Sequence, residues 1–412
     1  MSILTIKEHT LSNGIKVLYE QIPYVRSIAF KCHVSIGTKN ESDSNHGMAH
    51  FLEHMLFKGT ELRNSYQIAN QIERYGGSFN AYTAKEETAF YFNVVDEYFP
   101  LAVEVISDML LNSTMNEHDI EHEKKVVSEE IKGSIDAPDD IIWDYFIEQL
   151  LKPNACAKRT LGTLKSVKSF TRDQVLQFWK SNYTSDNITL SAVGNIDESS
   201  FLNTLEKSFN QIKSGSSQKI PFEIVNNKFQ KYYERDIMQS HILLGNQICR
   251  YSNPDRYPLI LLNNILGAGM SSRMFQNIRE KYGFAYTVYS TMDYQSDHGV
   301  FFNYVATDNK HIERCIELVK NEINSFLVGK ITDKEIEDAK YQIKGSILLS
   351  MENNSRRLDR ILRQYLNFGQ FIDMEDIVKQ FLAVTKDDLV RVAQTYMNTD
   401  LFSSTIITKK AS

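Results

Sequence analysis

The stretch Gly47-Met48-Ala49-His50-Phe51-Leu52-Glu53-His54-Met55-Leu56-Phe57-Lys58-Gly59-Thr60 says more about the fold than any other part of this 412-residue chain. Its apolar residues predict a helix over 48–57, on which His50 and His54 lie one turn apart on a single face. Two imidazoles at that spacing can bind one zinc ion. Glu53 lies near the same face, where a carboxylate is placed to accept a proton from a water molecule.

The pattern His-x-x-Glu-His is typical of metallopeptidases, although a five-residue pattern alone also fits a solvated helix whose histidines have no role. Two observations favour the metal site. Apolar residues bury this helix, and two buried histidines and a carboxylate without partners would be unfavourable. A third ligand is also available further along the chain, and catalytic zinc is usually held by three protein groups with one position open.

We expect the third ligand in the segment 121–131, whose apolar residues predict a buried helical stripe. Glu123 and Glu130 are seven residues apart and share one face of that helix. In this interpretation Glu130 binds the metal, while Glu123 hydrogen-bonds to another ligand. The alternative is an ordinary charged helix.

The two halves of the chain repeat one order of elements. In the first half the pattern predicts strands and helices at 27–36, 48–57, 65–75, 78–83, 88–95 and 102–111. In the second half it predicts them at 242–249, 257–266, 271–281, 285–292, 300–307 and 312–327. Tyr75-Gly76 and Tyr282-Gly283 are 207 positions apart, and half of the chain is 206 residues, which favours two copies of one unit.

This mixture of half-polar strands and helices predicts an α+β fold with two homologous domains, each a mixed or antiparallel sheet with helices packed on one face. We place the metal-binding domain at 1–210 and the second domain at 223–412. The intervening segment 211–222 is rich in serine, glycine and lysine and contains a proline, as is typical of a linker.

Composition narrows the class of protein. Apolar residues make up 42% and charged residues 24%, as in globular proteins, and the net charge of -6 gives no electrostatic reason to expect nucleic acid as a partner. Four well-separated cysteines do not suggest a disulfide framework. No signal or transit pattern is visible at the start, and no apolar run reaches the ~20 residues that span a bilayer. We therefore expect a cytoplasmic bacterial protein that does not enter a membrane, and the alternative is a processed organellar form that has lost its leader.

These motifs together resemble the pitrilysin-type zinc peptidases, or inverzincins. The nearest branch looks like the β-subunit of the mitochondrial processing peptidase and its short bacterial relatives. The resemblance rests on 50–60, on Glu130 following His54 by 76 residues, on 76–83, and on 271–275 and 279–286 in the second half. It implies an endopeptidase with one zinc ion per chain, in which His50, His54 and Glu130 bind the metal, Glu53 is the base and Glu123 assists.

The resemblance also implies residues that contact the peptide. Phe79, Asn80 and Ala81 match a strand that lies beside the substrate in the family. An exposed edge there would pair with an extended backbone, and the alternative is an ordinary buried strand. Arg279 and Tyr286 match a pair that reaches the bound peptide from the second half. From the residues alone, Arg279 would be a surface charge and Tyr286 part of the core.

Asp140 and Asp144 resemble acidic positions that receive a substrate arginine in the mitochondrial relatives, although a solvated helix face explains them equally well. The segment 158–160 departs from the Gly-Arg-Pro-like stretch of the relatives, and we expect it to lie far from the chemistry. His46 extends the row of His50 and His54 but precedes Gly47, before the expected helix. His118 and His122 are expected on the surface.

The resulting prediction is a peptide bound in an extended form in a chamber between the two domains, in a homodimer or a self-sufficient monomer. A non-catalytic scaffold or assembly subunit of the same family is the first alternative. A structural zinc protein is the second, but structural sites usually have four ligands and often use cysteine, and no cysteine lies near this motif.

Overall fold

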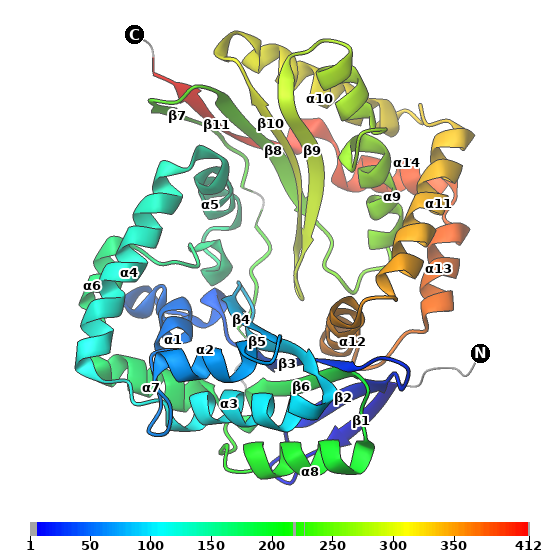
Figure 1. Ribbon diagram of the computed structural model, residues 1–412. Coiled ribbons are helices and arrows are strands. Elements are labelled where there is room, and N and C mark those ends of the chain that lie inside the picture. Colours follow the sequence, from blue (N-terminus) through cyan, green and yellow to red (C-terminus); the bar gives the residue numbers. More distant parts are fainter. Residues whose placement is uncertain (1–5, 217–219, 226, 411–412) are drawn as a thin grey trace. The chain divides into compact units, whose positions relative to one another are not determined.

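The computed structural model describes residues 6–216, 220–225 and 227–410. The chain forms two compact units, each built from three stretches of sequence (Figure 1). The first unit contains 1–133, 158–221 and 350–371, and the second contains 134–157, 222–349 and 372–412. The boundary between 221 and 222 falls at the end of the predicted linker, of which residues 217–219 lie outside the described ranges. The predicted domains are continuous in sequence, whereas these units are not. The segment 134–157 from the first half belongs to the second unit, and the segment 350–371 from the second half belongs to the first unit.

A six-stranded mixed sheet forms the centre of the first unit, in the order β1-β2-β6-β3-β5-β4. Strands β2 and β6 are parallel, and the other neighbours are antiparallel. Strand β4 therefore lies at one edge of the sheet. The strands are β1 (Ile6–Thr10), β2 (Lys16–Gln21), β3 (Ser27–Val34), β4 (Ser78–Thr83), β5 (Thr88–Val95) and β6 (Ile188–Gly194).

Helices cover both faces of this sheet. On one face Phe30 stacks on Phe92 with ring centroids 4.9 Å apart, and both rings meet Phe99 at the start of α3. On the opposite face α12 packs on β2, β3 and β6, with Ile361 in the same buried cluster as Ala29. The helices of this unit are α1 (Met48–Leu56), α2 (Ser65–Glu73), α3 (Phe99–Asn112), α4 (Glu117–Asp136), α6 (Leu164–Ser169), α7 (Arg172–Asn182), α8 (Glu198–Phe209) and α12 (Asn354–Phe368).

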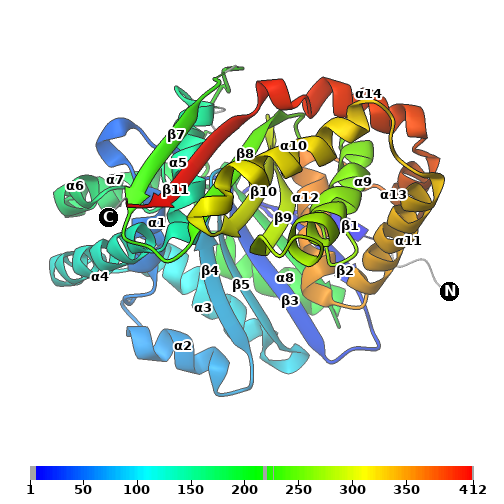
Figure 2. The same cartoon turned by 90° about the horizontal axis from the view of Figure 1, so that it is seen from above.

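The second unit repeats the topology of the first. Its sheet has the order β7-β11-β8-β10-β9, which can be followed in Figure 2, and β7 and β11 are the parallel pair. Five strands thus correspond one to one with β2, β6, β3, β5 and β4, which agrees with the predicted duplication. The strands are β7 (Gln230–Arg235), β8 (Ser240–Ile248), β9 (Ala285–Tyr294), β10 (Gly299–Thr307) and β11 (Ser403–Lys409).

The helices of the second unit also lie on both faces of its sheet. Helix α5 packs on one face, through Phe146 and its neighbours, and α9, α10 and α14 pack on the other. These helices are α5 (Pro138–Leu151), α9 (Arg256–Gly267), α10 (Ile312–Leu327), α11 (Asp333–Ser350), α13 (Met374–Ala383) and α14 (Lys386–Tyr396). No helix in the described part of the chain has the length and apolar character needed to cross a bilayer.

The predicted ranges 78–83, 88–95 and 312–327 coincide with β4, β5 and α10. The predicted helix 271–281 differs, because Phe275–Glu280 forms a π-helix in which Lys281 N donates to Gln276 O, five residues back. Gly283 then turns the chain in the left-handed region, with φ of 64°.

A buried ion pair fixes α12 on the first sheet. The guanidinium of Arg357 donates to both carboxylate oxygens of Glu20, which is 2% exposed, and to the carbonyl of Met351. Such a two-point pair between partners 337 residues apart in sequence defines where the helix lies. Removing one partner would leave the other charge buried without compensation.

We therefore expect Arg357→Ala to lower the free energy of unfolding by about 3–5 kcal/mol, because Glu20 loses its counter-charge. Equilibrium unfolding in urea measures the change. The matched control is Arg356→Ala, since Arg356 is exposed on the same helix and should change stability by less than about 0.5 kcal/mol. Equal effects of the two substitutions would contradict this account of the ion pair.

Candidate metal centre

Helix α1 begins at an N-terminus that is held by a buried carboxylate. Glu41, 4% exposed, accepts hydrogen bonds from the backbone N–H groups of Gly47 (2.7 Å) and Ala49 (2.8 Å). These are among the donors that a helix leaves unsatisfied at its N-terminus. Burial raises the pKa of Glu41 to about 8, despite these two hydrogen bonds.

Two glycines allow a loop to pack closely against this end of the helix. Gly162 packs on Gly47 so closely that a Cβ atom on Gly162 would lie 2.7 Å from His46 O and 2.9 Å from Gly47 Cα. His46 Nε2 lies 2.7 Å from the carbonyl of Arg159. Tertiary packing thus brings this loop against the residues that precede the helix with the two histidines, while the expectation that 158–160 lies far from the chemistry stays a prediction.

His50, His54 and Glu130 converge, each with one potential ligand atom, and these three atoms lie within 4.8 Å of one another. Glu130 Oε2 is 3.8 Å from His50 Nε2 and 3.6 Å from His54 Nε2. The imidazole rings are 4.5 Å apart between centroids. Two nitrogens and one carboxylate oxygen that meet in this way form the donor set of a three-ligand zinc site, so the residues present fit such a metal.

Glu123 orients one of the two histidines. This carboxylate is 1% exposed, and its Oε1 lies 2.8 Å from His54 Nδ1. The hydrogen bond places the proton on Nδ1 and leaves the lone pair of Nε2 facing Glu130. Lys58 forms an ion pair with the other oxygen of Glu123, at 2.5 Å. Sequence reasoning identified Glu123 but missed Lys58, which lies beyond the end of α1 and has no local pattern that indicates this contact.

The pKa values of the two histidines are shifted in opposite directions. Burial, followed by the neighbouring His54, lowers the pKa of His50 to about 3, so its ring is neutral near pH 7. For His54, burial also acts to lower the pKa, but the hydrogen bond to Glu123 and the carboxylates of Glu130 and Glu53 outweigh it and raise the value. His54 therefore holds its proton more tightly than His50 does.

Glu53 is half-buried on the same helix, and burial raises the pKa of its carboxyl group. The hydroxyl of Thr83, at the end of β4, donates to Glu53 Oε2 at 2.6 Å. A carboxylate with a raised pKa beside a cluster of metal-ligating atoms is suited to accept a proton from a water molecule. Thr83 belongs to the stretch 76–83 that sequence reasoning singled out, but no pattern indicated this contact.

Strand β4, which carries Phe79, Asn80 and Ala81, pairs only with β5 among the described residues. The turn is closed by Ala84 N donating to Glu87 O, and hydrogen-bonded pairs alternate along an antiparallel ladder. The backbone groups of Asn80 and Tyr82 therefore face β5, and those of the intervening residues face outward. The N–H of Ala81 agrees with this, since it donates to the side chain of its own neighbour Asn80 at 2.8 Å.

Arg279 and Tyr286 lie together in the second unit. The guanidinium of Arg279 is 4.9 Å from the ring centroid of Tyr286 and 4.6 Å from that of Phe275. Tyr286 is 73% exposed, so the interpretation of this residue as core was wrong. Asp140 lies in the first turn of α5, where Ser134 Oγ donates to it at 2.5 Å, and Asp144 lies one turn further along the helix.

The other histidines of the motif region do not join the cluster. His46 precedes the helix and contacts the loop at 159. The side chains of His118 and His122 are 91% and 63% exposed, as predicted for surface residues.

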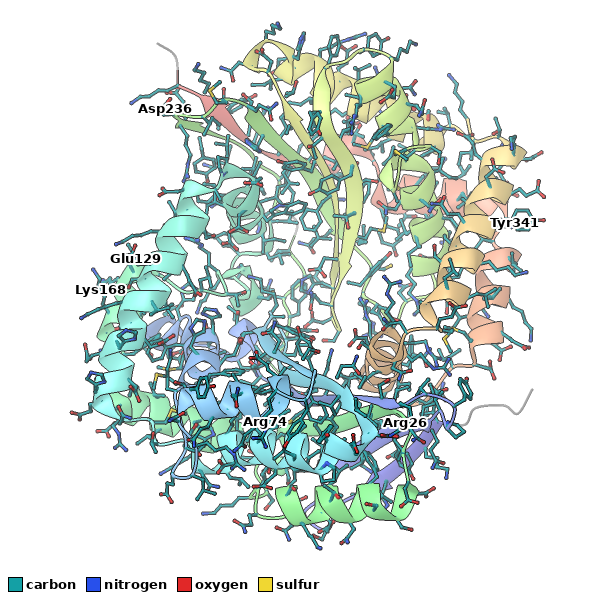
Figure 3. All side chains as sticks on the ribbon, viewed as in Figure 1. Arg26, Arg74, Glu129, Lys168, Asp236 and Tyr341 are labelled. Carbon is teal, nitrogen blue, oxygen red and sulfur yellow. The ribbon has the colours of Figure 1, made fainter. Side chains whose placement is uncertain are left out.

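We expect Glu130→Gln to weaken zinc binding by at least about 100-fold, because loss of a partner that merely orients a ligand already costs about 10–100-fold. Competition with a chromophoric chelator measures the affinity. Glu129→Gln is the matched control, because Glu129 projects outward from α4 and pairs with Lys132 (Figure 3). Its affinity should stay within about twofold of the unchanged chain. An equal loss in both variants would exclude Glu130 as a ligand.

Comparison with known proteins agrees with the fold and the motif. Residues 16–164 match the family model described as insulinase (peptidase family M16), and 169–343 match the model of the peptidase M16 inactive domain. The chain is 35% identical to an uncharacterised zinc protease of Rickettsia felis over 93% of both chains. It is 34% identical to one of Bacillus subtilis over 96% of both. A protease structure from Helicobacter pylori, 20% identical, has a TM-score of 0.90 over 98% of this chain and 100% of that one. Together with its His-x-x-Glu-His helix, these matches identify this chain as a member of peptidase family M16.

Proposed function

We propose that this chain is a zinc-dependent endopeptidase that hydrolyses extended peptides or presequence-like segments. The observation that carries the proposal is the position of Glu53, a half-buried carboxylate with a raised pKa, on the same helix as two of three converging ligand groups. The names of the relatives and the family support a peptidase.

One zinc ion, held by His50, His54 and Glu130, would lower the pKa of water towards about 7 and polarise the scissile carbonyl. Glu53 accepts the proton of the attacking water and later donates it to the leaving amine. Glu123, itself neutralised in part by Lys58, holds His54 with its Nε2 turned toward the metal position.

The peptide pairs with the free edge of β4 in this proposal. The outward-facing backbone groups of Phe79 and Ala81 offer donors and acceptors to an extended chain. Asn80 contributes differently, because its backbone faces β5 and its side chain occupies the N–H of Ala81. The Asn80 amide therefore has to move aside before a peptide can bond to that N–H.

Residues of the second unit complete the proposal. Arg279 and Tyr286, already in contact with each other, are proposed to hold the scissile carbonyl or its oxyanion. Asp140 and Asp144 are proposed to receive a cationic side chain of the substrate. The chamber between the domains, the homodimer and the cytoplasmic location stay predictions.

We expect Glu53→Gln to lower kcat by about 10²–10⁴-fold, because the amide cannot accept the proton, while the zinc content stays at one per chain. The measurement is cleavage of a peptide library by the purified protein, with and without chelator. A scaffold subunit of the same family would keep its function in this variant. Cleavage that survives both the substitution and chelation would reject the proposed function.

We also expect Ala81→Pro to raise KM for extended peptides by about tenfold, because the lost outward N–H is worth roughly 1 kcal/mol and the ring obstructs the edge. The ladder to β5 should stay intact, since this N–H does not belong to it. Tyr82→Pro is the contrasting variant, because it removes a ladder N–H and should destabilise the protein. Unchanged KM in Ala81→Pro would argue against pairing along β4.

A further inference from the structure

We propose that Thr83 is a positioning residue that anchors Oε2 of Glu53 from the edge strand, so that Oε1 is the atom that accepts the proton. This inference rests on the proposed function of Glu53 as a base. It assigns a role to a residue that is neither a ligand nor a catalytic group. It also links the edge where a peptide would pair to the orientation of the base.

The direction of the hydrogen bond follows from counting protons. Thr83 Oγ1 lies 2.6 Å from Glu53 Oε2 and 3.4 Å from Thr88 Oγ1. Thr88 is fully buried, and its hydroxyl donates to the carbonyl of Ile36 at 2.9 Å. Each hydroxyl has one proton to donate. With the proton of Thr88 engaged by Ile36, the proton of Thr83 is directed to Glu53 Oε2, which is the nearer of its two possible acceptors.

The same contact distinguishes the two carboxylate oxygens. Thr83 supplies the hydrogen bond to Oε2, and no other side-chain or backbone partner of this carboxylate is found in the described part of the first unit. A proton placed on Oε2 would compete with the proton of the threonine hydroxyl. Oε1 is therefore the oxygen left to accept a proton from water.

The position of Thr83 is itself well determined. Its neighbour Tyr82 points to the opposite face of the sheet, where its hydroxyl donates to Glu87 at 2.7 Å. Glu87 in turn pairs with the buried His33 at 2.8 Å, and Thr38 N donates to Ala84 O at 3.2 Å. The end of β4 is thus held on both sides of Thr83, which keeps its hydroxyl within reach of Glu53.

The backbone of Thr83 faces outward, like that of Phe79 and Ala81, because the closing pair of the turn is Ala84 with Glu87. A peptide that pairs along the edge would meet the residue whose side chain holds the base. The register of the peptide and the orientation of Glu53 are then set by one residue.

The test compares Thr83→Val, which keeps the shape and removes the hydroxyl, with Thr83→Ser, which keeps the hydroxyl. Steady-state kinetics on a cleaved peptide should show kcat reduced about 10–100-fold in the valine variant, as expected for a misplaced catalytic group. KM should stay within about threefold, and the serine variant should keep kcat within about threefold of the unchanged enzyme. A valine variant with normal kcat, or a serine variant as slow as the valine variant, would overturn the proposal.

Crystal structures of the zinc-loaded protein and its Thr83→Val variant provide a readout that does not depend on activity. A Glu53 carboxylate that rotates in the variant supports the anchoring role, and an unchanged carboxylate overturns it. Failure of the proposed function is recognised separately. In that case the unchanged protein, with one zinc ion bound, cleaves no peptide, while the two crystal structures still decide the role of Thr83.

Discussion

The hydrogen bond from His54 Nδ1 to the buried carboxylate of Glu123 is the contact on which the candidate site depends. The two residues are 69 positions apart, so the bond exists only when α4 lies along α1. Two turns further along α4, this arrangement brings Glu130 to the imidazoles. An isolated charge in the position of Glu123 would be unfavourable, and Lys58 supplies the opposite charge. The carboxylate of Glu123 thus fixes the tautomer of His54 and the distance between α1 and α4.

Local pattern predicts much of this arrangement. The spacing of His50, Glu53 and His54 places them on a buried helix, and the seven-residue spacing of Glu123 and Glu130 places those two on one face of another. Alternating residues also predict β4 and β5 at their observed bounds. The contacts of Lys58, Thr83 and Glu41 follow instead from packing between different elements. Nothing in the local pattern of these three residues indicates whether their side chains contact the site or point into solvent.

The exchange of helices between the two units illustrates the same limit. An amphipathic helix such as α12 has an apolar stripe that fits any apolar sheet face, so its sequence does not say which sheet it covers. On the first sheet α12 finds, besides its apolar contacts, a polar partner for Arg357 in Glu20, across most of the chain. Likewise, the loop at 158–162 has no pattern that connects it with α1. Its role follows from the absence of a Cβ atom on Gly162 and Gly47 where the two backbones meet.

The duplicated architecture separates the fold from the chemistry. In each unit a helix follows the strand that corresponds to β3: α1 in the first unit and α9 in the second. Helix α1 carries two histidines and a glutamate, whereas α9 has leucine, isoleucine and asparagine in its central turns and no histidine or carboxylate. The five corresponding strands have the same order in both sheets, so topology alone does not create a metal site. The candidate metal ligands are a few side chains on one copy of a repeated scaffold. In the second copy the corresponding helix α9 packs into the core through its apolar residues.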